Sequence, residues 1–238
     1  MRIPNRMAAV AAIASLAGCV SQPPEIPFDK SADNIHSIGI VTPSMPEKPS
    51  IWLASDVGQS FGLIGALVDA GMQASRDKEV WAMLTEEGKV PREDFAKAIQ
   101  ASLEAHGYAV KPIAVERNST DYLKTYPAAD TGTDAYLDIL VGNYGYVAAG
   151  IGNSTPYRPF LYLHCRLLRA SDAKVLMQDT ILYDPVTPIP TDKSVTLSPD
   201  PDYIFPEFSN MEADHKRTAA GLDASFHQTA DAVGHLLQ

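Results

Sequence analysis

Strict alternation of apolar and polar residues in the second half of the chain limits its fold more than any other feature. Within 160–168, FLYLHCRLL, the apolar set Leu161, Leu163, Cys165 and Leu167 alternates with Tyr162, His164 and Arg166. Successive side chains of a strand point to opposite faces, so this pattern predicts a strand with one buried face. The turn-like residues 169–174 and the apolar segment 175–183 come next, which predicts an antiparallel hairpin. The segment 134–147 alternates in the same way and is expected to join the same sheet.

Two other segments repeat their apolar residues every three or four positions, which is the period of a helix. In 92–106 these residues are Phe95, Ala98, Ile99 and Leu103, and Gly107 comes next as a stop signal. In 214–237 they are Leu222, Phe226, Ala230, Val233 and Leu237. The segments 35–41 and 108–115 predict short strands, and Pro112 places the second at an edge or near its own start, because proline has no N–H for a ladder.

The segment 57–73, VGQSFGLIGALVDAGMQ, combines glycines with a sequence that otherwise predicts a helix from about Trp52 to Ser75. A second short helix is expected in 78–88. Interior glycines each cost a helix about 1 kcal/mol relative to alanine, so we expect a close neighbour to compensate. Small residues recur at every fourth position, at Gly58, Gly62, Ala66 and Ala70. That neighbour could be the rest of the domain, a second copy of the chain or a membrane.

Together these segments predict an α+β fold, with an antiparallel-rich sheet of four to five strands and helices packed on one face. Residues 35–238 are expected to form one domain, because they are long enough for a single core. Residues 184–210 contain six prolines and no periodicity, which predicts a long surface loop.

The N-terminus has the parts of an export signal. Arg2 and Arg6 precede an apolar run that extends from Met7 to Gly18 and is too short to span a bilayer. The run ends in Leu16-Ala17-Gly18-Cys19, which resembles the lipobox of bacterial lipoproteins. The resemblance implies that residues 1–18 are a cleaved signal peptide and that the sulfur of Cys19 is acylated.

The residue after the cysteine bears on the location of the protein. In that family an aspartate at this position tends to retain the protein in the inner membrane, so Val20 implies the outer membrane, facing the periplasm. Residues 19–34 are expected to form a loosely attached tether, because 21–28 are proline-rich and show no periodicity.

The charge of the chain restricts its partners. The net charge is −10, and removal of residues 1–18 takes away two arginines and no acids, which makes it about −12. Such a surface repels nucleic acid and anionic head groups, so membrane attachment is expected through acyl chains on Cys19. Cys165 is then the one remaining cysteine and is expected to be a buried thiol, with an intermolecular disulfide as the alternative. We expect no cofactor.

One candidate site is a row of aromatic residues on the predicted sheet. Tyr136, Tyr144, Tyr146, Tyr162 and His164 fall on the outward positions of the alternating strands. They predict a patch that binds a partner protein or a glycan. The alternative is that tyrosines are simply favourable strand residues on the less buried face.

Two weaker patterns suggest chemistry. Gly58-Gln59-Ser60-Phe61-Gly62 fits the G-x-S-x-G motif of hydrolases, although no strand is expected before it. The partners of Ser60 would come from the acids Asp184 and Asp202 and from the bases His215, His227 and His235. A metal could bind between carboxylates and imidazoles four residues apart, at Asp223, His227, Asp231 and His235, but no further ligand completes such a site.

These observations favour a non-enzymatic role, as a lipid-anchored domain that binds or scaffolds another component of the cell envelope. A subunit of an oligomeric export or transport assembly and an esterase that uses Ser60 are the alternatives. The order of elements and the hairpin in 35–237 resemble the small α/β domain of several periplasmic lipoproteins. These are the curli secretion lipoprotein, activators of penicillin-binding proteins and auxiliary lipoproteins of ABC-type lipid transporters.

Overall fold

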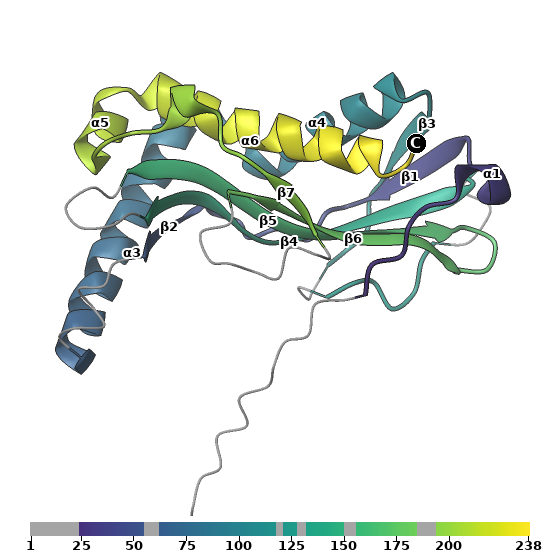
Figure 1. Ribbon diagram of the computed structural model, residues 1–238, viewed down its shortest axis with the longest axis horizontal. Helices are drawn as coiled ribbons and strands as arrows, with labels where there is room; N and C mark the ends of the chain where they lie inside the picture. Colours follow the sequence, from purple (N-terminus) through teal and green to yellow (C-terminus); the bar gives the residue numbers. More distant parts are fainter. Residues whose placement is uncertain (1–23, 55–61, 118–120, 128–131, 150–155, 185–193) are drawn as a thin grey trace, which may run out of the picture.

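The computed structural model describes residues 24–54, 62–117, 121–127, 132–149, 156–184 and 194–238. Within these ranges the side chains are described except at positions 54, 62–70 and 149. The fold is α+β, with one mixed sheet and helices packed on it (Figure 1). The predicted fold class is therefore confirmed.

The described part of the sheet has seven strands, more than the four to five expected. Its order is β3 (Ala109–Ile113), β1 (Ser37–Val41), β4 (Ala135–Ala149), β5 (Tyr157–Arg169), β6 (Val175–Tyr183) and β7 (Val195–Leu197), and β2 (Ser50–Ala54) pairs with the far end of β4. The long ladders β4–β5 and β5–β6 are antiparallel, whereas β1 pairs in parallel with both β3 and β4. The alternating segments and the hairpin were thus predicted correctly. The proline-containing strand β3 lies at the edge of the sheet, as expected.

The helices α4 (Pro91–Ala105) and α6 (His215–His235) lie against one another across one face of the sheet (Figure 1). Their predicted apolar residues are buried in the core between helices and strands. Phe226 of α6 packs against Phe95 of α4 and Tyr144 of β4, with ring centroids 5.4 Å and 5.9 Å away. Cys165 is a fully buried free thiol in the same core, as expected.

The region before α4 differs from the prediction. Residues 50–54 form strand β2, and one long helix, α3 (Gly62–Glu86), replaces the two helices expected between 52 and 88. Val80, Met83 and Leu84 anchor the C-terminal part of α3 in the core. The N-terminal part runs past the end of the sheet (Figure 1). The local sequence does not reveal β2, because its partner in the ladder lies almost a hundred residues later.

A β-bulge at Gly142 changes which residues of β4 face the helices. Leu137, Ile139 and Val141 face the core, and the register shifts between Val141 and Asn143. Tyr144 and Tyr146 consequently face the core as well, and the Tyr146 hydroxyl donates to the Thr218 carbonyl of α6 at 2.5 Å. Glycines also admit neighbouring strands here: a Cβ at Gly145, where φ is +140°, would lie 2.0 Å from the Ser50 carbonyl oxygen of β2.

Residues expected to be loosely attached or irregular form further contacts. Ile26 forms a bridge with Gln178 of β6, and α1 (Lys30–Asp33) places Asp33 2.7 Å from Arg169, so residues 24–33 pack on the sheet. The described parts of 184–210 contain β7, the short helix η3 (Pro201–Tyr203) and the start of α5 (Phe208–Ala213). The expectation of an unstructured loop is wrong for these residues.

Candidate functional site

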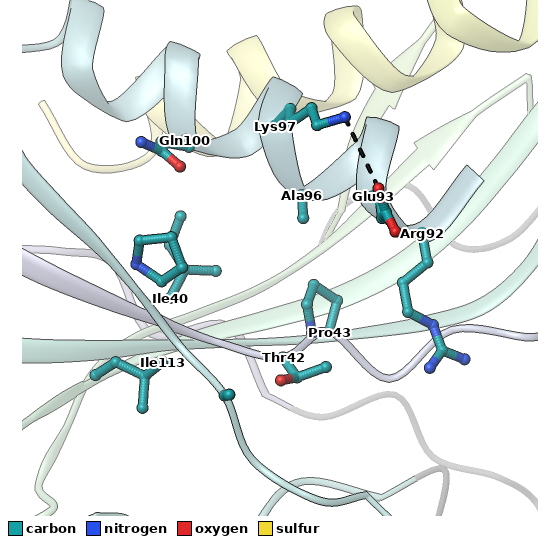
Figure 2. A pocket seen from close by; sticks show the side chains of 11 residues that line it. Ile40, Thr42, Pro43, Arg92, Glu93, Ala96, Lys97, Gln100 and Ile113 are labelled. Atoms are coloured by element: carbon teal, nitrogen blue, oxygen red, sulfur yellow. Dashed lines mark ion pairs between the residues drawn. The ribbon is translucent and has the colours of Figure 1, made fainter. Parts of the chain in front are cut away.

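A groove opens between α4 and the carboxyl ends of the parallel strands β1 and β3 (Figure 2). Its volume is about 360 Å³. Ile40, Pro43, Pro112, Ile113 and Ala114 form its apolar floor, and Ala96 of α4 lies opposite them. Carboxyl ends of parallel strands are common ligand sites in open α/β sheets, and apolar concave surfaces with few polar groups are common binding sites.

The groove exists because α4 turns only one side to the core. Phe95, Ala98, Ile99 and Leu103 are buried against the sheet and α6. The flank that carries Arg92, Ala96 and Gln100 lies along the groove, since residues four apart share one side of a helix. Ala96 is half-buried and points from α4 towards the floor (Figure 2), so its small side chain leaves the space open.

Hydrogen-bond donors predominate at the rim of the groove. Arg92 Nη2 donates to the Met45 carbonyl at 2.8 Å, which holds the guanidinium beside the chain that comes after β1. Lys97 Nζ lies 3.9 Å from Glu93 and 3.8 Å from Asp94, and its side chain is 72% exposed. Pairs of this length at the surface contribute little to stability, so the ammonium can interact with a ligand.

Strand β3 forms the outer wall of the groove and the edge of the described sheet. In a parallel ladder, alternate residues direct both backbone groups towards the same neighbour. The Ala109 N–H donates to His36 and the Ile113 carbonyl accepts from Thr42, so positions 109, 111 and 113 face β1. Val110 and Pro112 therefore direct their backbone groups to the outer edge.

A polar cluster around Asp138 covers part of the sheet face opposite to the helices. Asp138 is completely buried and accepts hydrogen bonds from Arg117, from the Leu123 N–H at 3.0 Å and from the Tyr126 hydroxyl at 2.5 Å. Burial, together with the hydrogen bond to Asp138, raises the pKa of Tyr126 well above its usual value, so this phenol stays protonated. The cluster joins Arg117, Leu123 and Tyr126 to β4, and both carboxylate oxygens of Asp138 are taken up by these partners.

Three further polar side chains on that face form a chain of hydrogen bonds. The Tyr162 hydroxyl lies 2.6 Å from His164 Nε2, and His164 Nδ1 lies 2.7 Å from Thr180 Oγ1. Burial lowers the pKa of His164, so the imidazole is neutral at neutral pH. The arrangement orders three neighbouring strand residues, with each hydroxyl bound to one ring nitrogen.

The aromatic row predicted from the sequence does not form one exposed patch. Tyr136, Tyr144 and Tyr146 are buried, and Tyr162 and His164 are partly accessible. The bulge at Gly142 turns Tyr144 and Tyr146 to the helix face, whereas Tyr136 remains on the other face, stacked on Tyr126. The expected outward placement is therefore wrong for Tyr144 and Tyr146, because it assumed uninterrupted alternation along β4, whereas Tyr136 keeps the expected face but is buried against Tyr126.

Several other predicted positions lie outside the described residues. Cys19, Gly58 and Ser60 are among them, and Gly62, Ala66 and Ala70 belong to α3 without described side chains. Their roles in lipidation, catalysis and helix packing stay predictions. The expectation that no strand precedes the G-x-S-x-G motif was wrong, since β2 ends at residue 54 and α3 begins at residue 62.

Three of the residues proposed as partners of Ser60 or as metal ligands have other contacts. Asp184 accepts from Arg158 Nε at 2.7 Å, and His215 Nδ1 lies 2.9 Å from Glu86. Asp223 forms an ion pair with Lys89. No three histidines, cysteines or acids within the described ranges group as metal ligands, and none of the described helices is both long and apolar enough to cross a bilayer.

Comparison with known proteins finds partial structural alignments but shows no family. No protein-family model and no curated protein matches the chain. Protein XCC0632 from Xanthomonas campestris aligns over 88% of this chain and 84% of its own, with 12% identity and a TM-score of 0.45. Lipoprotein GNA1162 from Neisseria meningitidis aligns over 62% and 81%, with 18% identity and a TM-score of 0.31. The PelC dodecamer from Paraburkholderia phytofirmans aligns over 65% and 74%, with 10% identity and a TM-score of 0.31.

The groove was not anticipated from the sequence. Its signals are nevertheless present: Arg92, Ala96 and Gln100 recur at helical spacing on the side of α4 away from its apolar stripe, and Pro112 marks an edge strand. The placement of this side of α4 above β3 has no local signal in the sequence.

Proposed function

We propose that the chain is a lipid-anchored protein of the bacterial outer membrane that faces the periplasm and binds or scaffolds another envelope component without catalysis. The observation that carries the proposal is the sequence Leu16-Ala17-Gly18-Cys19 at the end of the N-terminal apolar run. Acylation of Cys19 supplies the anchor, because several acyl chains give stable membrane attachment that a single chain does not.

The contacts of the first described residues support a short connection to the membrane. Gln178 Nε2 donates to the Pro24 carbonyl at 2.8 Å, so the domain holds the chain five residues after Cys19. Five residues reach about 17 Å at full extension. An acylated Cys19 would therefore hold β6 close to the lipid surface.

The binding role is assigned to the groove between α4 and β3. It combines an apolar floor with exposed donors on Arg92 and Lys97, and it is open to a partner. The polar clusters around Asp138 and His164, by contrast, are occupied by their own hydrogen bonds.

The anchor is tested by Cys19→Ser in cells supplied with a clickable fatty acid. We expect the variant to lose the label and to leave the membrane fraction. Cys165→Ser is the matched control, because Cys165 is the only other cysteine and is fully buried, so this variant should keep both the label and the location. A Cys19→Ser protein that stays labelled and membrane-bound would contradict the proposal.

An esterase remains the second candidate, because β2 and α3 flank the segment that contains Ser60 in the strand and helix order of the hydrolase motif. The esterase candidate requires that the protein hydrolyse generic esters and that Ser60→Ala abolish the activity.

A subunit of an oligomeric assembly is the other alternative, and the native mass of the membrane-extracted protein distinguishes it from a monomeric scaffold.

A further inference from the structure

We propose that the groove between α4 and β3 binds an extended, acidic peptide segment of another protein, which adds as a strand to the outer edge of β3. This inference rests on the proposed binding role of the groove and specifies its partner. Strand addition obtains affinity from main-chain hydrogen bonds and specificity from pockets for alternate side chains. The edge of β3 offers outward-facing main-chain groups and lies beside a groove that can take side chains.

The backbone of β3 supplies the hydrogen bonds. Among the described residues β3 pairs with β1 alone, so the N–H and carbonyl of Val110 and the carbonyl of Pro112 point away from the sheet. Pro112 has no N–H, and a proline at an edge limits indiscriminate pairing with other strands. A short ladder remains, so the contacts made in the groove must determine which segment binds.

The groove lies beside this edge and accepts side chains of the added strand. Ile40 and Pro112 occupy the same register on adjacent strands and line the floor below Ala96 of α4. Side chains two residues apart in an extended peptide point to the same side, so two of them enter the groove together. A volume of about 360 Å³ is at the small end of ligand sites, which suits a few side chains.

The charges at the rim select an acidic segment. Arg92 and Lys97 lie on the groove, and Glu93 is the single acid among its lining residues. The lining thus carries one more cation than acids, in a chain whose net charge is −10. A second apolar groove between β7 and α6 is lined by Val195, Leu197 and Leu236 but has Asp231 as its charged residue, so it would repel the same ligand.

Random peptides of about ten residues are displayed on phage and selected for binding to the full-length protein in lipid nanodiscs. Peptides that bind empty nanodiscs are removed first. We expect enriched peptides with an acidic residue and two apolar residues at alternate positions. Ala96→Phe fills the groove and should weaken a synthetic selected peptide about tenfold or more, a change of about 1.4 kcal/mol. Ala101→Phe makes the same change at an exposed position of α4 outside the groove lining and should leave the affinity unchanged.

Two further measurements define the mode of binding. Hydrogen exchange of the Val110 N–H should slow when the peptide binds, because that group then becomes a donor in the new ladder. Lys97→Glu should weaken the peptide about threefold or more, whereas Lys78→Glu, an exposed lysine on α3, should not. Correct folding of each variant is checked by its melting temperature.

The outcomes separate this inference from the proposed function. Absence of enriched peptides, unchanged affinity in Ala96→Phe or unchanged exchange at Val110 would each overturn strand addition. A fatty acid found in the groove by native mass spectrometry, and lost in Ala96→Phe, would also overturn it. In each case, if Ala96→Phe also abolished cross-linking of the protein to its partner in cells, the proposed binding role of the groove would still stand.

Discussion

The two faces of the sheet are covered in different ways. On the helix side, Phe226 of α6 packs against Phe95 and Tyr144 in an apolar core. On the opposite side, Asp138 is buried among Arg117, Tyr126 and the backbone of Leu123. The first arrangement is held by apolar burial and packing, which involve no ionised group. The second depends on complete pairing of a buried charge, since an unpaired one is costly. Despite this contrast, both arrangements are closed by contacts of the chain with itself.

The groove between α4 and β3 has features of both regions but is not closed. It has an apolar floor like the core and cations like the polar cluster, yet Lys97 remains mostly exposed. A partner can cover the part of the groove that the chain leaves open. We therefore place the binding function there.

The largest effect is expected on the helix side. Phe226→Ala removes a fully buried ring at the contact of two helices with the sheet, and it should lower the free energy of unfolding by about 4 kcal/mol. Denaturant titration measures the loss, which should be the same at low and high salt. A loss below about 1 kcal/mol would mean that this ring does not pack in the core as described.

A somewhat smaller effect is expected from the opposite face. Asp138→Asn keeps the shape of the side chain but leaves Arg117 buried without its counter-charge, so it should cost about 3 kcal/mol. Asp172→Asn, in an exposed i,i+3 pair with Arg169, should cost less than about 0.5 kcal/mol. Equal unfolding free energies for the two variants would remove the distinction between the faces.

The smallest effect is a dependence of stability on pH. The pKa of His164 is lowered by burial in the folded protein, so the unfolded chain binds a proton more readily. The stabilisation is fully present above the unfolded pKa of about 6.5 and decreases as the pH falls through the folded pKa. His164→Gln should reduce the difference in unfolding free energy between pH 7.5 and pH 5 by less than about 1 kcal/mol, because the ring is only half-buried and partly screened. An unchanged or larger difference would contradict this assignment.

The parts of the fold that were predictable are those whose signal is local. Alternation identified β5, the turn and the apolar segment after it identified β6, and helical periodicity identified α4 and α6. The strands β2 and β7 were missed because they are short and their partners are distant or parallel. The exchange of faces within β4 was missed although Gly142 was a visible signal, since an isolated glycine in a strand often marks a bulge.

The candidate site required tertiary information. Pro112 correctly indicated an edge strand, but no sequence pattern reports which helix lies above it. The tyrosines attracted attention because tyrosine is common at interfaces, and three of them are instead buried by the bulge and by residues 121–127. Small residues such as Ala96 carry little signal alone, yet here they leave the space that makes the groove.

Site-specific photo-cross-linking in intact cells tests whether the lipid-anchored domain binds its partner at the groove between α4 and β3. A photoreactive residue is placed at Gln100, which lines the groove, or at the neighbouring exposed residue Ala101, which does not. We expect a discrete protein adduct from position 100 that disappears when Ala96→Phe fills the groove, and no adduct from position 101. Equal adducts at both positions, or an adduct at position 100 that persists in Ala96→Phe, would contradict the assignment of partner binding to the groove.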